Sequence, residues 1–385
     1  MTESDLSCRV THSRGRQLFD MASKFENVIN LTLGDPDMLP ELTIRNAGCE
    51  AIMKGNTRYS ANAGLYGVRK AYVDFINERY NTNFLPENNV IVTVGAMEAL
   101  YLALLSSINP GDDVIIFSPY YINYYQMIRM CGGNPVIVET KEENDFIPQL
   151  EIIREAICNR TKMIIINSPH NPTGTVYPSD TINGIIEIAQ ENRLLLISDE
   201  VYSALVYRGN EHYSVLQNKN GYKDVLVVDS CSKRFSMTGW RIGFATGPEE
   251  WIEAMTKLQE NVAACAPLPS QYAALEAYER KSDITEYMAI LEKRRDVLVR
   301  KLAKTDKLFF TIPKAAFYLF VNVKKTGKSG MEFSLELLEK EKVAVVPGDA
   351  YGDSFGNYIR IAYTIEEREL LVASKRILDF CGEHT

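Results

Sequence analysis

Residues 163–174 read MIIINSPHNPTG, and residues 194–202 read LLLISDEVY. In both stretches a short apolar run ends in polar residues. Because such runs are short and lack strict apolar–polar alternation, they indicate strands that are covered on both faces. Together with five similar runs they predict a mainly parallel, seven-stranded sheet sandwiched by helices. The five read VIVTVG (90–95), VIIFSP (114–119), PVIVET (135–140), VLVVDS (225–230) and RIGFATG (241–247).

The segments around these runs predict an α/β chain of two domains. Helix-like stretches lie between the runs, for example at residues 149–157 and 179–192. After residue 247 the pattern changes to longer helices and then to a few separate strands, which is typical of an α+β unit. We therefore expect a large domain over residues 45–275. A smaller α+β domain would combine residues 1–44 with residues 276–385.

Composition narrows the class of protein further. The chain has 385 residues, of which 46% are hydrophobic and 24% charged, and its formal net charge is −8. This is ordinary globular composition, and the acidic balance disfavours a partner such as nucleic acid or an anionic membrane. The seven cysteines and four histidines show no ligand-like spacing, so no metal site is expected. Scattered cysteines and the lack of an apolar signal at the N-terminus favour a cytoplasmic protein.

Polar side chains directly follow several of the predicted strands. In open α/β sheets, ligands bind beyond the carboxyl ends of the strands, which is where these side chains lie. A glycine turn that opens a helix follows the first run and suits an anion. Each of these residues has an ordinary explanation as a turn, cap or surface side chain, but their shared position favours one site. The chain lacks GxxxxGK[ST], and no GxGxxG follows a strand, so nucleotide-binding fingerprints are absent. The residues are Gly95, Ala96, Tyr121, Asn171, Asp199, Tyr202, Ser230, Ser232, Lys233 and Arg241.

Three motifs in a fixed order carry a resemblance to a known family. SPHNPTG (168–174), SDEVY (198–202) and SCSKRFSMTGWRIGF (230–244) resemble the fold-type I pyridoxal phosphate (PLP) enzymes, specifically the aspartate and aromatic class I/II aminotransferases. NTRYSANAGLYGVRKA (56–71) and YIRIAYT (358–364) also match. The resemblance implies PLP as cofactor. It further implies ping-pong transfer of an amino group from an L-amino acid to a 2-oxo acid.

The same resemblance implies a role for each catalytic residue. Lys233 forms the Schiff base with PLP and moves the proton at the substrate Cα. Asp199 pairs with the pyridine nitrogen and keeps it protonated. Asn171 and Tyr202 bind the phenolic oxygen of the ring, and Tyr121 stacks on it.

The remaining roles concern the phosphate, the substrate and the partner subunit. Arg360 binds the substrate α-carboxylate, with help from Gly34 and Asn171. Tyr59 reaches across to the phosphate of a second subunit, which implies a homodimer. The other residues implied in cofactor binding, chiefly at the phosphate, are Gly95, Ala96, Met97, Ser230, Ser232 and Arg241.

Two features leave alternatives open. Met97 stands where a branch of aspartate aminotransferases has a lysine for the distal carboxylate, and residues 263–272 contain no arginine. Strict aspartate specificity is therefore not predicted, although Arg9, Arg14 or Arg16 of the N-terminal arm would supply such a charge. A PLP-dependent C–S β-lyase needs the same lysine and aspartate and is the alternative reaction. A non-catalytic PLP-binding module is the third hypothesis.

Overall fold

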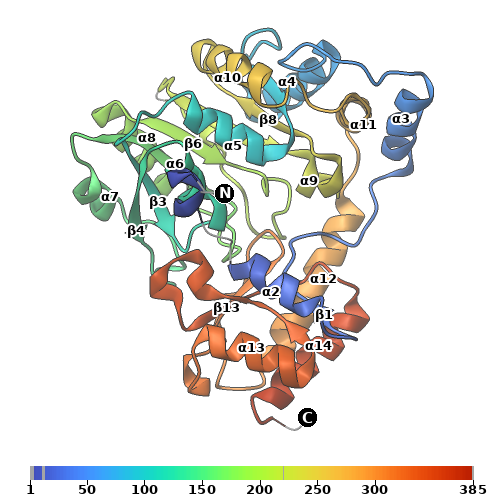
Figure 1. Ribbon diagram of the computed structural model, residues 1–385, viewed down its shortest axis with the longest axis vertical. Coiled ribbons are helices and arrows are strands. Elements are labelled where there is room, and N and C mark those ends of the chain that lie inside the picture. Colours follow the sequence, from blue (N-terminus) through green and yellow to red (C-terminus); the bar gives the residue numbers. More distant parts are fainter. Residues whose placement is uncertain (1–3, 11–13, 220, 384–385) are drawn as a thin grey trace.

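The computed structural model describes residues 4–10, 14–219 and 221–383. Figure 1 shows two parts, one above the other: a large sheet flanked by helices, and a smaller part that contains the C-terminal third. The N-terminal helix α2 (Arg14–Ala22) lies with the smaller part. From α2 onward, the chain therefore starts in the smaller part, builds the larger one and returns.

The larger part is built on a seven-stranded sheet in the order β2-β8-β7-β6-β5-β3-β4. Neighbouring strands are parallel except at β8, which runs antiparallel to β2 and β7. Each of the seven predicted runs supplies one strand, so the mainly parallel sheet is confirmed. The strands are β2 (Val90–Thr93), β3 (Asp113–Ser118), β4 (Asn134–Glu139), β5 (Thr161–Asn167), β6 (Leu195–Asp199), β7 (Val225–Ser230) and β8 (Gly243–Thr246).

Helices cover both faces of this sheet, as β3 illustrates. Val114 and Ile116 pack in one apolar cluster with α5, α6 and α10. Ile115 and Phe117 point the other way and pack with α7 and α8. This two-sided burial is the reason that the runs do not alternate. The helices of this part are α3 (Leu42–Met53), α4 (Tyr66–Tyr80), α5 (Gly95–Leu105), α6 (Ile122–Met130), α7 (Leu150–Ala156), α8 (Ser179–Asn192), α9 (Cys231–Arg234), α10 (Glu249–Val262) and α11 (Leu268–Glu279).

The smaller part has a four-stranded antiparallel sheet in the order β12-β13-β10-β9. A second, two-stranded sheet joins the N-terminal segment to the C-terminal third, because β1 pairs in parallel with β11. The strands are β1 (Ile29–Asn30), β9 (Phe309–Phe310), β10 (Tyr318–Asn322), β11 (Val343–Ala344), β12 (Val346–Pro347) and β13 (Tyr358–Ala362). The helices are α2, α12 (Thr285–Leu302), α13 (Gly330–Glu341) and α14 (Glu367–Phe380).

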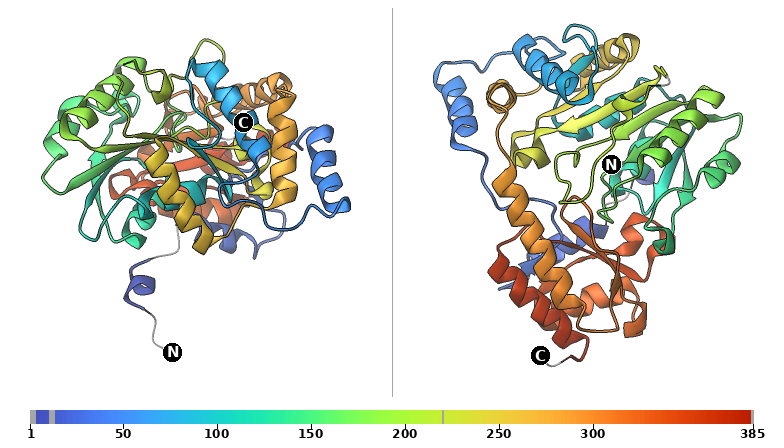
Figure 2. Two further views of the ribbon diagram at one scale, coloured as in Figure 1. Left: turned by 90° about the horizontal axis from the view of Figure 1, so that it is seen from above. Right: turned by 180° about the vertical axis from the view of Figure 1, so that it is seen from behind.

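Helix α12 follows the larger part in sequence and runs down into the smaller one, as Figure 2 shows from behind. Its Arg294 forms a bidentate ion pair with Asp37, with Nη1 and Nη2 at 2.7 and 2.8 Å from the two carboxylate oxygens. This pair ties the segment after β1 to α12. The short elements are α1 (Asp5–Arg9), η1 (Glu142–Asn144), η2 (Val215–Gln217), η3 (Thr238–Trp240), η4 (Lys324–Thr326), η5 (Gly348–Tyr351) and η6 (Asp353–Phe355).

In the described ranges, no helix has the length and apolar character needed to cross a membrane. Within the same part of the chain, no three His, Cys, Asp or Glu side chains gather in a way that would hold a metal ion.

Candidate active site

A cavity of about 350 Å³ opens at the carboxyl ends of the central strands and is bordered by both parts of the molecule. Most of the site residues expected from the sequence line it. Gly95 lies just behind its wall, and Tyr59 lies away from it. The expected residues in the lining are Gly34, Ala96, Met97, Tyr121, Asn171, Asp199, Tyr202, Ser230, Ser232, Lys233, Arg241 and Arg360.

Lys233 projects from the short helix α9, directly after β7. Its Nζ donates a hydrogen bond to the carbonyl oxygen of Gly34 at 2.6 Å. Burial lowers the pKa of the amine to about 8; the Asp35 charge opposes this shift, and the guanidinium groups of Arg360 and Arg241 assist it. A lysine with this pKa is partly neutral under mildly alkaline conditions and can then act as a nucleophile or a base.

Asp199 lies at the end of β6 and is buried. One carboxylate oxygen accepts the hydroxyl proton of Tyr124 at 2.5 Å, and the other accepts the Val201 amide at 3.3 Å. Burial raises the pKa of this carboxyl to about 6, although the bonds from Tyr124 and Val201 favour the ionised form. An ionised Asp199 therefore has a strong electrostatic preference for a cation that contacts it inside the cavity.

Tyr124 is a site residue that the sequence reasoning missed. It lies on α6, three positions after Tyr121, and the two rings meet edge to face with centroids 5.4 Å apart. Residues three apart on a helix share a face, so the PYYINYY stretch (119–125) held a usable signal. The target of the hydroxyl, 75 positions further along the chain, was not visible in that pattern.

A positively charged corner lies where α5 begins. Gly95 has φ +75°, and a Cβ built there would lie only 2.3 Å from Nη2 of Arg241. The Arg241 guanidinium in turn donates to the carbonyl oxygen of Thr238 at 3.0 Å. The hydroxyl oxygens of Ser230 and Ser232 lie 2.9 Å apart in the same lining. A helix N-terminus, a guanidinium and two hydroxyls suit a phosphate group.

A second cation enters the cavity from the smaller part. Arg360 on β13 is buried, and its Nη1 donates to Oδ1 of Asn171 at 3.2 Å. Its Nη2 donates to the carbonyl oxygen of Thr32. The guanidinium also lies 4.4 Å from the ring centroid of Tyr318, while its Nε is buried without a hydrogen-bond partner. An unpaired buried donor of this kind is costly unless an anion completes it.

One part of the cavity lining, at Met97, Tyr121 and Asn123, is neutral. The Tyr121 hydroxyl lies 3.4 Å from the Met97 sulfur, and Nδ2 of Asn123 donates to that hydroxyl at 2.9 Å. On another side, the hydroxyls of Tyr202 and Tyr318 lie 2.9 Å apart. Asn123 and Tyr318 had no motif to mark them, and their side chains become site residues only through the fold.

The remaining predicted residues lie elsewhere. Tyr59 is 86% exposed and does not line the cavity of its own chain. The side chains of Arg9, Arg14 and Arg16 fall outside what the structure describes. His170 is buried, its Nδ1 lies 2.7 Å from the Thr173 hydroxyl, and burial lowers its pKa to about 3. It is thus a neutral packing residue.

Comparison with known proteins agrees with this geometry. A family model described as aminotransferase class I and II matches residues 26–377. The chain belongs to this family. An aspartate aminotransferase of Pyrococcus horikoshii is 36% identical over 96% of this chain and 94% of its own length. An aromatic-amino-acid aminotransferase of Thermococcus litoralis is 35% identical over 98% and 97%, respectively.

Solved structures agree as well. An aspartate aminotransferase from Thermus thermophilus, determined with maleate, matches with a TM-score of 0.92 and 33% identity over 98% of each chain. The predicted fold-type I architecture and the predicted aminotransferase activity are both confirmed. The protein is a PLP-dependent enzyme that transfers amino groups.

The cavity fits this cofactor by its own chemistry. Asp199 offers a buried carboxylate to a ring nitrogen, and Lys233 offers an amine of lowered pKa to an aldehyde. Because Gly95 lacks a Cβ, the Arg241 guanidinium lies against the start of α5, where it offers a phosphate its positive charge. These three groups line or adjoin one cavity whose volume suits a small cofactor and substrate.

Proposed function

We propose that Lys233, Asp199 and Arg360 are the groups through which this aminotransferase works, and that its donor is an L-amino acid with a neutral side chain. The observation that carries the proposal is their convergence on one cavity, although they lie on a helix, on a strand of the large sheet and on a strand of the small sheet. A 2-oxo acid would then accept the amino group in the second half of the reaction.

When bound, PLP withdraws electrons from the substrate Cα and holds the amino group between the two half-reactions. The protein has to supply proton transfer and orientation. Lys233 would take the proton from the substrate Cα and deliver it to C4′ of the cofactor, and would move it the opposite way in the second half-reaction. Its lowered pKa makes this feasible near neutral pH. The ionised Asp199 keeps the ring nitrogen protonated. Tyr202 and Asn171 donate hydrogen bonds to the ring oxygen.

Arg360 would bind the substrate α-carboxylate. Its Nε lacks a partner, and its Nη1 already bonds Asn171, so the guanidinium is held in one orientation before the substrate arrives. A carboxylate placed there completes the unpaired donor and forms a charge-assisted pair. Gly34 would help to shape this end of the cavity, since a Cβ there would clash with Tyr318, which lines the same cavity. The Lys233 bond to the Gly34 carbonyl would break as the lysine engages the cofactor.

The neutral donor is inferred from the charges in the cavity. Among the described side chains that line it, the cations are Lys233, Arg241 and Arg360, and each already has a role. Met97 and Asn123 form a neutral wall beside Tyr121, the residue that would stack on the cofactor ring, and this wall suits an aromatic or large apolar side chain. The relative from Thermococcus litoralis is named an aromatic-amino-acid enzyme, which favours the same class. The relative from Pyrococcus horikoshii is named an aspartate enzyme, so aspartate is the decisive competitor.

The donor class is tested with a panel of amino acids and no acceptor. Phenylalanine, tyrosine and aspartate are mixed in turn with PLP-loaded protein, and formation of the aminated cofactor is followed. We expect the aromatic donors to have the higher second-order rate constant for this half-reaction. A preference for aspartate would contradict the proposed class, and release of ammonia with pyruvate from a β-substituted donor would favour the C–S lyase.

A homodimer is the second part of the proposal. Tyr59 is 86% exposed, and Met53, Leu42 and Ile52 of the preceding helix α3 are 86%, 60% and 57% exposed. Apolar exposure of this kind favours coverage by a second copy. Tyr59 would then reach the phosphate corner of that copy.

Complementation between two inactive variants tests the shared site. Lys233→Ala and Tyr59→Ala proteins are unfolded together and refolded as a mixture. Mixed dimers would contain one fully native site, so activity should return to a fraction of the wild-type level. Monomers in sedimentation analysis, or mixtures without regained activity, would contradict the proposal.

We also keep the two-domain division and the cytoplasmic location as proposals. The division into residues 45–275 and residues 1–44 with 276–385 is supported by the two sheets, which draw their strands from different parts of the chain. The location is supported by the lack of disulfides among the cysteines of the described ranges. Limited proteolysis and fractionation test these two points.

A further inference from the structure

Buried charged residues adjoin the site residues in sequence but do not line the cavity. Glu200 follows Asp199, and Arg234 follows Lys233. Both are buried, at 2% and 6% exposure, and both are absent from the cavity lining. They therefore belong to a layer of buried polar side chains behind the cavity wall. Within this layer, both carboxylate oxygens of Glu200 accept hydrogen bonds.

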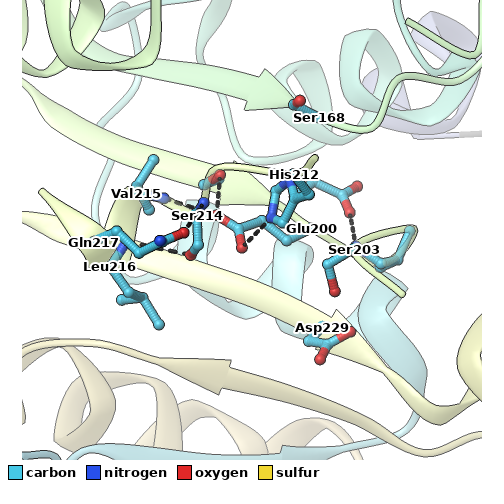
Figure 3. Close-up of polar contacts among 12 residues, drawn as sticks. Ser168, Glu200, Ser203, His212, Ser214, Val215, Leu216, Gln217 and Asp229 are labelled. Carbon is cyan, nitrogen blue, oxygen red and sulfur yellow. Dashed lines mark hydrogen bonds and ion pairs between the residues drawn. The ribbon is translucent and has the colours of Figure 1, made fainter. Parts of the chain in front are cut away.

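The carboxylate of Glu200 is held by three donors. One oxygen accepts the Ser198 hydroxyl at 2.9 Å and the Val215 amide at 3.1 Å. The other accepts Nε2 of His212 at 3.0 Å. Figure 3 shows His212, in the loop before η2, and the backbone of Val215, the first residue of η2, approaching this carboxylate. The side chain of Glu200 thus fastens the end of β6 to a loop more than ten residues away.

The backbone of Glu200 joins Asp199, the last residue of β6, to the turn at residues 201–204 that carries Tyr202. Its amide donates to the carbonyl oxygen of Val228 on β7 at 2.8 Å, and its carbonyl accepts the Ser203 amide at 2.8 Å. Residues 201–204 have no helix or strand hydrogen-bond ladder of their own. The anchor at Glu200 is therefore one of the contacts that orient this turn, together with the bonds that Arg79 and Arg234 donate to Ser203.

We infer that Glu200 is a positioning residue, whose contacts with His212, Ser198 and Val215 aim Asp199 and Tyr202 at the cofactor. The inference rests on the roles proposed above for those two residues. Loss of the anchor would let the turn rotate and carry the Val201 amide away from Asp199. The carboxylate would then lose one of the two hydrogen bonds that hold it in line with the ring nitrogen. Glu200 itself touches neither cofactor nor substrate.

The charge of Glu200 also affects the pKa of Asp199. Burial is the main cause that raises the pKa of Asp199, and the charges of Asp229 and Glu200 add to it. Arg234 and Arg79 lie on the other side of the layer, where both donate to Ser203. Removing the Glu200 charge should therefore lower the pKa of Asp199. Removing the hydrogen bonds of Glu200 should instead misplace the Asp199 carboxylate.

Two substitutions at Glu200 separate the effect of its charge from the effect of its hydrogen bonds. An ionised carboxylate only accepts, so the His212 proton must be on Nε2, while Nδ1 is buried without a partner. In Glu200→Gln the amide oxygen still accepts from Ser198 and Val215. The amide nitrogen then donates to Nε2, and the histidine proton moves to the unused Nδ1. Glutamine keeps the anchor and alanine removes it.

Three variants test the inference: Glu200→Ala, Glu200→Gln and the exposed neighbour Glu211→Gln as control. The readouts are the Kd for PLP, the pH midpoint of the bound cofactor's visible absorption, and the His212 tautomer by nitrogen NMR.

For Glu200→Ala we expect PLP binding to weaken by about tenfold or more, as loss of a charged hydrogen-bond set implies. The pH midpoint should shift as well. Glu200→Gln should bind PLP within about threefold of wild type, with the His212 proton on Nδ1. The control should match wild type.

A lower melting temperature in Glu200→Ala with unchanged PLP affinity and pH midpoint would overturn the inference, since that pattern marks a purely structural residue. If this variant does not fold, His212→Leu decides in the same way. It removes one of the three donors and should shift both readouts in the same direction by a smaller amount; an unchanged pH midpoint would overturn the inference. Asp199→Asn is measured alongside. If it too leaves PLP affinity and midpoint unchanged, the proposed role of Asp199 fails instead.

Discussion

Replacing Tyr124 with phenylalanine removes the hydroxyl that donates to the Asp199 carboxylate and leaves the aromatic ring in place. That hydroxyl lies 2.5 Å from the carboxylate and is buried, and Tyr124 does not line the cavity. The change therefore acts on the cofactor only through Asp199. Because the lost bond favours the ionised carboxylate, its removal raises the pKa of Asp199.

The size of the effect follows from the bond that is lost. A hydrogen bond to an ionised group contributes about 2 kcal/mol, and one pKa unit corresponds to about 1.4 kcal/mol. The pKa of Asp199 should therefore rise from about 6 to about 7.5. If the ionised carboxylate is the form that holds the ring nitrogen, the Kd for PLP scales as one plus the ratio of protonated to ionised Asp199. The variant should bind PLP about eightfold more weakly than wild type near pH 6.5, and about equally near pH 9.

The assay is a PLP titration of the cofactor-free proteins across this pH range, followed by visible absorption. Effects of pH on Lys233 cancel in the ratio of the two affinities, because both proteins share that residue. Tyr125→Phe is the matched control: it lies on the same helix and stacks on Tyr120, away from Asp199. A ratio that stays constant with pH, or a control that shows the same pH dependence, would refute the proposed pairing of Asp199 with the cofactor.

Three other predictions concern different parts of the structure. Arg360→Lys should raise KM for amino acids by about tenfold or more, because the two-point carboxylate contact is lost, while the PLP spectrum should stay as in wild type; an unchanged KM would contradict the role. Gly95→Ala should displace Arg241 and weaken PLP binding by about tenfold; equal affinity by titration would show that the corner tolerates a Cβ. Arg294→Ala should lower the free energy of unfolding by about 3 kcal/mol, because it leaves Asp37 without its bidentate partner, and urea denaturation measures this loss.

The large sheet was predictable because its strands are buried on both faces. A run such as residues 163–167, MIIIN, has no polar side to present, and that property is visible in a single sequence. The direction of β8 was not visible, because the run at residues 241–247 reads like the others. Its antiparallel course is set by the short connection through α9 and η3, which returns the chain directly beside β7.

The site divides in a similar way. Lys233, Asp199 and Asn171 stand in contiguous motifs, so their place beyond the strand ends could be predicted. The pairing of Tyr124 with Asp199 and of Tyr318 with Tyr202 could not be predicted, because these partners are distant in sequence. The Tyr124 hydroxyl meets Asp199 from a helix, and the Tyr318 hydroxyl meets Tyr202 from the smaller part of the molecule. Contacts of this kind depend on packing rather than on a local pattern.

The central claim is that Lys233 carries the cofactor, and chemical trapping measures this directly. PLP-loaded protein is reduced with borohydride, digested and analysed by mass spectrometry, with Lys233→Ala treated in parallel. We predict that the cofactor remains attached to the peptide containing Lys233, and that the variant carries no attached cofactor on any peptide. Stable attachment at another lysine in the wild-type protein would contradict the account.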